Sequence, residues 1–467
     1  MIKDIPWIKE NIVKLPLDDG FVPAVLWNRY FKKRIEESVV STSLSIAVIK
    51  DNDSILIHKT LIFPDNSEFY QANYYYVERL IKTLLWIYGG YKIIMSGPGD
   101  IIDYIAKQYS KDGERSFDSC FMSKIYEKPF TVEYVNAENM PLPKEKSEKL
   151  GGFLKGCRIG FDLGASDRKV SAVINGKPVF SEEVIWNPST QSDAFYHYNE
   201  IMSMIDQAAS YMPHVDAIGG SSAGIYINNR VMSASIFRSI PPDIFEKKVK
   251  NVFIDIQKKW KVPLKIINDG KITALAGSMS LKKDSILGIA MGSSEAGGYV
   301  DSKNRIGPGI DELAFVPVDF NPQAPMDEWS GDIGCGVQYF SQVAVIRLAL
   351  KAGIVFEPDK PFAERLKSIQ ELLVKGDERV RKVFETIGSY FGYAISYYSG
   401  FYDIKAVLIL GRVTSGKGGK IILDEAKKVL RKDFPELFGK IDIFLPDEKN
   451  RRVGQSIAAA SLPEIEK

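Results

Sequence analysis

The sequence predicts an α/β protein built from more than one lobe. At 467 residues the chain is longer than a single hydrophobic core usually organises, so two or three lobes are expected. Short segments rich in β-branched residues alternate with amphipathic helical segments, which is the pattern of α/β folds. A polar stretch at residues 136–156 has no apolar period and ends in glycine. It predicts a linker that separates an N-terminal region from the rest.

Composition limits the possible functions. Hydrophobic residues make up 45% and charged residues 26% of the chain, as in globular soluble proteins. The net charge of +2 offers no field that would attract nucleic acid or a membrane surface. The first 19 residues are charged and lack the apolar core of a signal peptide, and no run of about 18 apolar residues occurs. We therefore expect a cytoplasmic protein without a nucleic-acid or membrane partner.

Cysteine and histidine are rare. The cysteines are Cys120, Cys157 and Cys335, and the histidines are His58, His197 and His214. Widely separated cysteines argue against a disulfide framework and for a reducing compartment. No histidine stands at metal-ligand spacing from a cysteine, which argues against a zinc site.

Before the linker, three short strands are expected at residues 44–50, 54–60 and 61–63. A helix follows at residues 74–88. Its apolar residues recur at helical spacing and form one stripe: Val77, Leu80, Ile81, Leu84, Leu85 and Tyr88. Gly89 and Gly90 end this helix, and residues 91–99 predict a further strand and turn.

After the linker a similar order recurs. Strands are expected at 157–164, 169–174 and 177–184, a helix at 193–212, and a strand with its turn at 215–224. A β-β-β-α-β pattern thus starts near residue 43 and again near residue 157. Both a decayed duplication and a chance similarity of a common α/β pattern explain this recurrence.

The remaining elements complete the α/β pattern. They are a strand–turn–strand at 289–300, a long helix at 377–400, a buried strand opening into a glycine-rich turn at 405–420, an amphipathic helix at 420–434 and a closing helix at 451–465.

Two strand–turn–strand segments could hold phosphate groups. In the first, a strand ends at Asp162 and leads into Gly164, Ala165 and Ser166; in the second, a strand leads into Gly292, Ser293 and Ser294. Small turn residues let backbone N–H groups approach a phosphate, and a carboxylate at the mouth of the first turn, Asp162, can hold Mg²⁺ through water. Either turn alone is also an ordinary hairpin. Glu295 counts against the second, because a carboxylate repels phosphates.

Two further segments could complete a phosphotransferase site. Gly411 and Arg412 begin a glycine-rich turn after a buried strand, a position that commonly lies under a nucleotide but also suits an ordinary βα loop. Asn268 and Asp269 stand between a strand and a helix. There Asp269 could accept a proton from a substrate hydroxyl, or it could simply be the residue that caps the helix.

The order of these four segments resembles the two-lobed actin-like, hexokinase-like ATPase fold (ribonuclease H-like). Within that fold, residues 157–463 resemble the ROK family of sugar kinases and sugar-responsive repressors. The family's D-x-G-G-T turn corresponds to residues 162–166, its G-T-G-x-G-G-G turn to residues 292–298, and its Asn-Asp pair followed by an alanine-rich helix to residues 268–277. Its Gly-Gly on the nucleotide side reads Gly411-Arg412 here.

The resemblance implies specific roles. Asp269 would be the general base, and Asn268 and Glu312 would bind sugar hydroxyls, with Ser221 and Ser222 as further candidates. ATP and Mg²⁺ would be the cofactors, bound by the two turns and by Gly411 and Arg412. The lobes would comprise residues 157–275 with 453–467, and residues 276–452. A homodimer is expected.

The chain departs from the family in one segment. The family's G-E-x-G-H-x-x-x-D segment aligns with residues 311–319, where Phe315 replaces the histidine that contacts sugar and zinc. In the zinc-binding loop only Cys335 is kept, and Val337 stands in place of a glutamate. Zinc is therefore expected to be absent, and the ordinary contacts to a pyranose are in doubt. Five residues could supply other contacts, or most of them could simply be surface or loop residues: Asp311, Asp327, Glu328, Trp329 and Asp332.

Two functions follow from the resemblance. The first is an ATP-dependent kinase of a sugar-like hydroxyl. The second is a sugar-binding sensor that has lost turnover. Residues 1–150 contain no helix-turn-helix and no basic recognition helix, so a DNA-binding repressor is not expected. These residues are instead expected to form an additional α/β domain.

Overall fold

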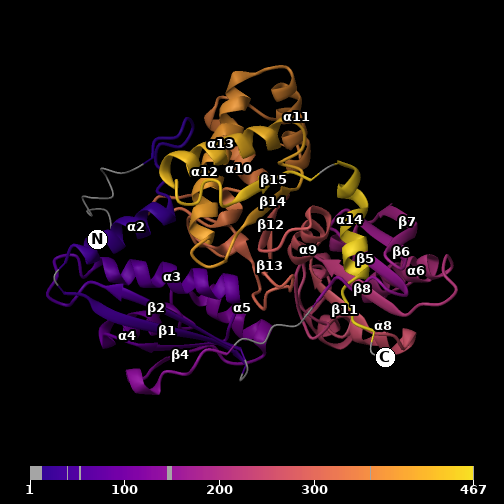
Figure 1. Ribbon diagram of the computed structural model, residues 1–467, viewed down its shortest axis with the longest axis horizontal. Coiled ribbons are helices and arrows are strands. Elements are labelled where there is room, and N and C mark those ends of the chain that lie inside the picture. Colours follow the sequence, from indigo (N-terminus) through magenta and orange to yellow (C-terminus); the bar gives the residue numbers. More distant parts are fainter. Residues whose placement is uncertain are drawn as a thin grey trace.

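The computed structural model describes residues 13–38, 40–51, 54–144, 150–357, 359–446 and 448–465. The charged start of the chain and the middle of the expected linker lie outside these residues. Figure 1 shows three masses: the N-terminal region, a first lobe that includes the C-terminal helix, and a second lobe above the other two.

The N-terminal region is an α/β layer. Its sheet has the order β2-β1-β3-β4; β1 pairs antiparallel with β2 and β3, and β3 pairs parallel with β4. Its elements are α2 (Ala24–Glu36), β1 (Thr42–Asp51), β2 (Ser54–Ile62), α3 (Ala72–Tyr88), β3 (Lys92–Ser96), α4 (Gly99–Gln108), α5 (Ser116–Tyr126) and β4 (Thr131–Tyr134). The strands expected at 54–60 and 61–63 are one continuous strand.

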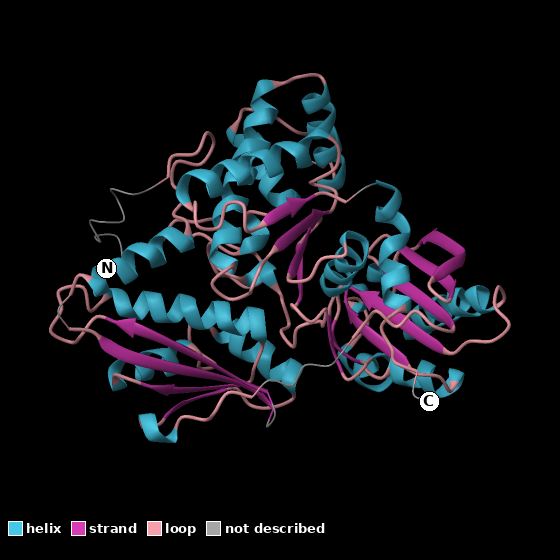
Figure 2. Cartoon of the chain, viewed as in Figure 1, coloured by secondary structure: helices cyan, strands magenta, loops and turns pink. Residues whose placement is uncertain are grey.

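The first lobe is built on a mixed five-stranded sheet, visible in Figure 2. The strand order is β11-β8-β5-β6-β7, with β5, β8 and β11 parallel and β6 and β7 antiparallel. Its elements are β5 (Cys157–Leu163), β6 (Asp167–Ile174), β7 (Lys177–Ile185), α6 (Ala194–Ala209), β8 (Ala217–Ser222), β9 (Ile225–Ile227), β10 (Arg230–Ser233), α7 (Pro242–Ile244), α8 (Val252–Trp260), β11 (Leu264–Asn268) and α9 (Asp269–Leu281).

The closing helix α14 (Glu448–Ala460) returns to this first sheet and packs on β5 and β8. The contact requires a glycine in β5, because a Cβ at Gly160 would lie 1.7 Å from the Ser456 carbonyl oxygen. The two ends of the ATPase-like segment are therefore joined in one lobe.

The second lobe combines a four-stranded sheet with long helices. The strand order is β13-β12-β14-β15, and β12 pairs parallel with β14. The elements are β12 (Ile286–Met291), β13 (Glu295–Val300), α10 (Gln342–Lys351), α11 (Phe362–Val374), α12 (Glu378–Tyr398), β14 (Ala406–Leu410), α13 (Lys417–Asp433) and β15 (Asp442–Phe444).

The recurrence of the strand pattern is not a recurrence of topology. Only β1 and β2 precede helix α3 in the N-terminal sheet, and β1 pairs antiparallel with the strand that follows that helix. In the first lobe the corresponding pair, β5 and β8, is parallel. The N-terminal sheet is thus not a copy of the first lobe's sheet, and the topology gives the duplication hypothesis no support.

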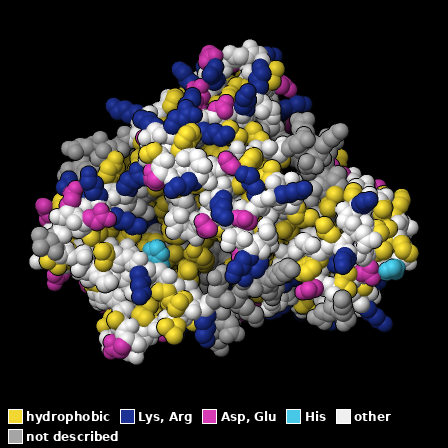
Figure 3. All heavy atoms as spheres, viewed as in Figure 1, with side chains coloured by type: hydrophobic (Ala, Val, Ile, Leu, Met, Phe, Trp, Pro, Cys, Tyr) yellow, Lys and Arg dark blue, Asp and Glu magenta, His cyan; other side chains and the backbone are white. Residues whose placement is uncertain are grey.

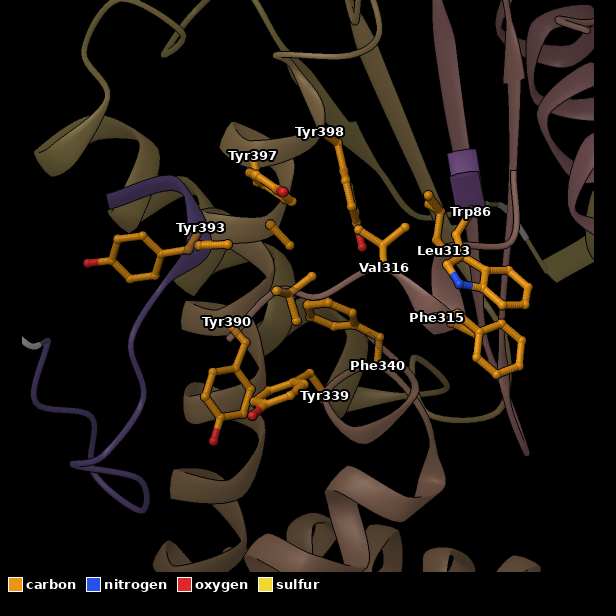
Figure 4. Packing of buried hydrophobic residues seen from close by; sticks show 14 of the residues in the cluster. Trp86, Leu313, Phe315, Val316, Tyr339, Phe340, Tyr390, Tyr393, Tyr397 and Tyr398 are labelled. Atoms are coloured by element: carbon orange, nitrogen blue, oxygen red, sulfur yellow. The ribbon is translucent and has the colours of Figure 1, made fainter. Parts of the chain in front are cut away.

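The N-terminal region and the second lobe share one hydrophobic core. A single cluster of buried residues runs from Phe21 and Trp27 through α3 to Phe315, Tyr339 and α12, and Figure 4 shows part of this packing. Most buried residues of the first lobe form a separate cluster, whereas Ile225 and Met232 of that lobe belong to the shared one. The N-terminal region is therefore not packed as an independent domain, because α3 buries both its apolar stripe and its opposite face. The limits at residues 150, 275 and 452 stay a prediction.

The surface carries mixed charge. On the face shown in Figure 3, lysine and arginine side chains alternate with aspartate and glutamate, in keeping with a net charge of +2. Among the described residues no helix is long and apolar enough to cross a membrane.

The shared core predicts joint unfolding of the N-terminal region and the second lobe. Trp27 is 1% exposed and lies 5.3 Å from Phe31 and 5.6 Å from Phe320 between ring centroids. Trp27→Ala should cost about 3–5 kcal/mol and lower the urea midpoints of α3 and α12 together, as followed by hydrogen exchange. Phe253→Ala, in the first lobe's cluster, is the control for a local loss. An unchanged α12 midpoint in Trp27→Ala would contradict a shared core.

Candidate active site

Three turns from the two lobes meet at one place. The turns follow the carboxyl ends of β5, β12 and β14. A hydrogen bond joins the lobes, since Arg412 Nη2 donates to Ser166 Oγ at 3.2 Å. Gly411 has a φ of +105°, and a Cβ there would lie 2.2 Å from the Met291 carbonyl oxygen. Glycine is thus required for the third turn to lie against the second.

The tips of the two phosphate-type turns are open. Ala165 and Ser166 in one turn, and Ser293 and Ser294 in the other, are exposed. The amides of Gly164 and Gly292, in contrast, donate within their own hairpins, to the Asp167 and Ser294 carbonyls at 2.9 Å each. These two N–H groups therefore close the turns, and phosphate binding by the other amides of each turn stays a prediction. Because Gly164 and Gly292 have no side chain, a phosphate could still approach the backbone of the two turns.

Asp162 is buried at the mouth of the first turn. One oxygen accepts a hydrogen bond from Ser221 Oγ at 2.5 Å, and the other lies 3.8 Å from Lys169 Nζ. Burial raises the pKa of Asp162 despite the nearby ammonium. Lys169 also lies 3.0 Å from Asp167. The first turn thus has a buried carboxylate with a half-buried cation beside it.

Ser221 and Ser222, which were candidates for sugar binding, are not accessible to a ligand in this structure. Both are fully buried, and parallel pairing of β8 with β5 sets them opposite Asp162 and Leu163. Ser221 therefore donates to Asp162, and Ser222 donates to the Leu163 carbonyl at 3.1 Å. Their role in this structure is to orient the end of β5.

Asn268, not Asp269, caps helix α9. Asn268 Oδ1 accepts from the Gly270 amide at 2.7 Å, so the capping interpretation does not account for Asp269. The Asp269 side chain keeps part of its surface exposed, and its Oδ1 lies 3.0 Å from the same amide. Burial, and then the charge of Asp162, raise the pKa of Asp269 to about 6. A carboxylate with a pKa near the working pH is well suited to accept a proton.

Glu312 reaches the same place from the second lobe. Its Oε1 lies 3.5 Å from Asn268 Nδ2, which donates to the Gly224 carbonyl at 2.8 Å. Burial, then Asp269 and Asp311, raise the pKa of Glu312 to about 8. The side chain is partly exposed. Near neutral pH it is therefore a protonated acid, which can donate one hydrogen bond as well as accept.

Glu295 does not face the phosphate-type turn. It is 3% exposed, and burial, then Glu312, raise its pKa well above the usual value. Neither of its oxygens has a hydrogen-bond partner among the described residues, and it lies under Gly336. Because Glu295 is buried and its raised pKa favours the uncharged form, the objection raised by the sequence is weakened.

Two nearby residues carry no signal in the sequence. Lys169 is the third residue of β6, and a lysine in a strand is ordinarily expected to be exposed to solvent. Tyr226 lies on the short strand β9, and burial, with smaller contributions from Asp269 and Asp162, raises its pKa above the usual range. Only the return of β9 past the end of β11 brings Tyr226 to the carboxylates.

A cavity of about 480 Å³ adjoins the Asn268 end of the site. Asn268, Gly224 and Lys271 bound it on one side, and Lys50 and Tyr126 of the N-terminal region bound it on the other. The cavity beside Asn268 and Asp269 is therefore lined by residues of the N-terminal region, before the expected linker, and by residues that follow the linker.

The loop that departs from the ROK pattern is buried by the N-terminal region. Phe315 is 5% exposed and stacks on Trp86, with ring centroids 4.1 Å apart. Cys335 is fully buried, and burial raises its pKa to about 12. The acidic residues Asp311, Asp327 and Asp332 are loop residues, as the second interpretation expects, but they are buried and hydrogen-bonded, not at the surface. Glu328 and Trp329, in contrast, are exposed, as that interpretation expects.

One cluster that sequence spacing missed lies at the opposite end of β5. The side-chain ligand atoms of Cys157, His214 and Asp216 lie within 4.8 Å of one another. Asp216 Oδ2 accepts from the Cys157 amide at 2.7 Å and lies 3.3 Å from His214 Nε2. These contacts account for the cluster as a local hydrogen-bonded anchor of β5.

No protein-family model and no curated protein matches the sequence. Solved structures do match. A ROK family transcriptional regulator, a homologue of the E. coli MLC protein, superposes with a TM-score of 0.53 at 16% identity over 70% of this chain and 81% of its own. A ROK hexokinase from Thermus thermophilus gives 0.51 at 16% identity over 66% and 98%. This chain has the ROK fold. The expected actin-like, hexokinase-like fold class is confirmed.

Within the ROK fold the two matched proteins are a kinase and a regulator by name. The fold therefore does not choose between turnover and sensing. That choice has to come from the chemistry of Asp162, Asp269 and Glu312.

The coupling between the two aspartates can be measured directly. Asp162→Asn removes the charge that helps to raise the pKa of Asp269, so that pKa should fall from about 6 while burial keeps it above the usual value for aspartate. A carbon-13 NMR titration of the carboxyl groups reports it. Asp167→Asn is the matched control, because Asp167 is not among the charges that act on Asp269. An unchanged Asp269 titration in Asp162→Asn would show that the two groups are not coupled.

Proposed function

We propose that this chain is an ATP-dependent kinase of a sugar or sugar-like hydroxyl, with Asp269 as general base. The observation that supports it best is a partly exposed carboxylate whose pKa of about 6 is set by burial and by Asp162, at the junction of two lobes. Such a group can take a proton from a hydroxyl as the oxygen attacks a phosphoryl group.

The acceptor would lie beside Asn268 and Glu312, whose side chains are 3.5 Å apart. Asn268 is fixed by its bonds to Gly270 and Gly224, so its amide is oriented before a ligand arrives. Glu312, protonated near neutral pH, would donate a hydrogen bond to an acceptor oxygen. With Phe315 turned into the core against Trp86, one polar contact is missing from the acceptor side. The acceptor is therefore proposed to be sugar-like, but not bound by the ordinary pyranose contacts.

The nucleotide would lie along the three turns. The exposed turn tips, Ala165–Ser166 and Ser293–Ser294, would bind phosphates through backbone amides and hydroxyls. Gly411 and Arg412 would lie on the nucleotide side. Lys169 and Arg412 add positive charge there, and Arg412 would exchange its bond to Ser166 for a phosphate oxygen.

Mg²⁺ fits the carboxylates that are present. Asp162 and Asp269 are close enough for the charge of Asp162 to raise the pKa of Asp269, and a divalent cation would relieve that repulsion. Asp162 would hold the ion through water, with Ser221 orienting the carboxylate. When bound, Mg²⁺ neutralises charge on the transferred phosphoryl group. The proposal also keeps the expectation of a homodimer.

A sensor without turnover is the second candidate. The Arg412–Ser166 hydrogen bond lies across the turns that a triphosphate would follow, which favours a closed form without nucleotide. Calorimetry with Mg-ATP separates the two candidates: heat with a thermal shift is expected for the kinase, and stabilisation by a sugar alone is expected for the sensor.

The general base can be tested by substitution. Asp269→Asn should lower phosphoryl transfer by at least about 100-fold while Mg-ATP binding is kept, because only the proton acceptor is lost. The assay is a panel of sugars, polyols and sugar acids with radiolabelled ATP, and Asp255→Asn, an exposed α8 residue, is the matched control. Turnover equal to the wild type would remove Asp269 from the mechanism.

The pH profile gives an independent test. A base works only when deprotonated, so kcat/KM should fall as the pH drops through about 6, the pKa of Asp269. In Asp162→Asn the residual activity should show this acidic limb at lower pH. A limb near the ordinary aspartate pKa of about 4 in the wild type would contradict the assignment.

A further inference from the structure

The C-terminal end of α3 holds the loop that carries Glu312. The Glu312 amide donates to the Trp86 carbonyl at 2.9 Å, and the Asp311 amide donates to the Ile87 carbonyl at 3.0 Å. These carbonyls belong to the last turn of α3, where a helix leaves its C=O groups without intrahelical partners. The acceptor side of the second lobe is thus hydrogen-bonded to a helix that lies far earlier in the chain.

The Trp86 side chain strengthens the same junction. Its ring stacks on Phe315, three residues after Glu312, with an interplanar angle of 29°. Figure 4 shows the two side chains next to each other. Its Nε1–H donates to Asp118 Oδ1 of α5 at 2.7 Å. Trp86 therefore contacts the Glu312 loop through both backbone and ring, and its own orientation is fixed from α5.

A buried ionic network ties the same helix to the loop that follows. Asp332 accepts from Arg79 with both oxygens at 3.1 Å, and lies 3.1 Å from Lys82 Nζ and 2.5 Å from Arg115 Nη1. Lys82 also contacts Asp118 at 2.9 Å. Burial by itself raises the pKa of Asp332. The charges of Arg79, Lys82 and Arg115 outweigh burial and hold this pKa well below its usual value.

The network is balanced in charge. Its cations are Arg79, Lys82 and Arg115, and its anions are Glu78, Asp118 and Asp332. All but Arg115 are at most 3% exposed. Loss of one partner would leave a buried charge unpaired, which is strongly destabilising. The Asp332 loop therefore cannot move away from α3 without breaking the whole set.

The Asp332 loop in turn pairs with the segment directly after Phe315. The Gly336 amide donates to the Val316 carbonyl at 2.9 Å, and the Val318 amide donates to the Gly334 carbonyl at 2.8 Å. The short 3-10 helix η6 (Leu313–Phe315) thus lies between two attachments to α3, one through Trp86 and one through Asp332.

We propose that Trp86 and the Arg79–Lys82–Asp332 network are positioning residues for Glu312, and that the N-terminal region serves to fix the acceptor subsite. The inference rests on the proposed function, since it assigns Glu312 to the acceptor. The physical reason is that α3 is a rigid helix buried on both faces, so its last turn supplies a fixed platform. A shift of about 1 Å at a group that orients a substrate can cost as much as about 100-fold.

The test uses Trp86→Leu in the full chain, with two readouts. Hydrogen exchange at the Asp311 and Glu312 amides, measured without any substrate, should accelerate by at least about 10-fold because the ring contact that holds the junction is lost. In the kinase assay the KM for the acceptor should rise by at least about 10-fold, with the KM for Mg-ATP unchanged. Trp86→Phe keeps a ring against Phe315 and should recover most of both effects.

Ile105→Ala is the matched control. Ile105 is fully buried in α4 of the same N-terminal region and belongs neither to the ionic network nor to the Glu312 loop. Its truncation should lower stability and leave both exchange at 311–312 and the acceptor KM as in the wild type. If Trp86→Leu does not fold, Phe315→Leu removes the same stack from the other side and carries the same expectations.

The outcomes separate the two proposals. Exchange at 311–312 in Trp86→Leu equal to that in Ile105→Ala overturns the positioning role. So does an equal rise in the KM for acceptor and nucleotide. If the wild type phosphorylates no acceptor, the kinase proposal fails, while accelerated exchange would still support the attachment of the Glu312 loop to α3.

Discussion

The site depends on the parallel pairing of three strands, β5, β8 and β11. Their register sets Asp162 opposite Ser221 and Ser222 opposite both Leu163 and Asn268. Parallel strands end at one edge of a sheet, so the acidic end of β5 and the Asn-Asp end of β11 must lie near each other. A one-residue slip in either pairing would turn these side chains to the other face and separate the two carboxylates.

That geometry gathers carboxyl groups in a buried place, where their charged forms are costly. Asp162, Asp269, Glu295 and Glu312 all have a raised pKa, with burial as the first cause in each case. Buried carboxyls without paired cations are costly for folding, and here the Lys169 ammonium stays 3.8 Å from Asp162. A fold that keeps such a cluster has a site that a cation-bearing ligand would stabilise.

The sequence predicted most of the ROK-like segment because its cues are local. Periodicity and neighbouring residues predict the helix at 377–400, the strand at 405–410 and the Asn-Asp junction. The structure has α12, β14 and the β11–α9 boundary at these places.

Ser221 and Ser222 were misassigned because strand pairing, which is long-range, decides what a serine contacts. The hydrogen bond by which the Gly164 amide closes its own turn could not be predicted, because one sequence does not distinguish such an amide from an open one. The role of residues 1–150 escaped prediction for a related reason. Glu78, Arg79 and Lys82 look like the solvated face of an ordinary helix. Only the pairing of Arg79 and Lys82 with Asp332, which is 253 residues from Arg79, and of Glu78 with Arg115 shows that this face is buried.

The ionic network also explains how the divergent loop is held. The resemblance to the ROK motifs predicts that this loop holds no zinc, because Phe315 stands in place of the histidine and Cys335 alone is kept of the cysteines. In this chain Asp332 is surrounded by three cations from α3 and the start of α5, and Phe315 lies on Trp86. Non-covalent contacts therefore stabilise the loop, namely the ion pairs of Asp332 and the stacking of Phe315 on Trp86. Such pairs are strong only when every partner is present and desolvated. This arrangement therefore requires the N-terminal region to be packed against the second lobe, as it is in the shared core.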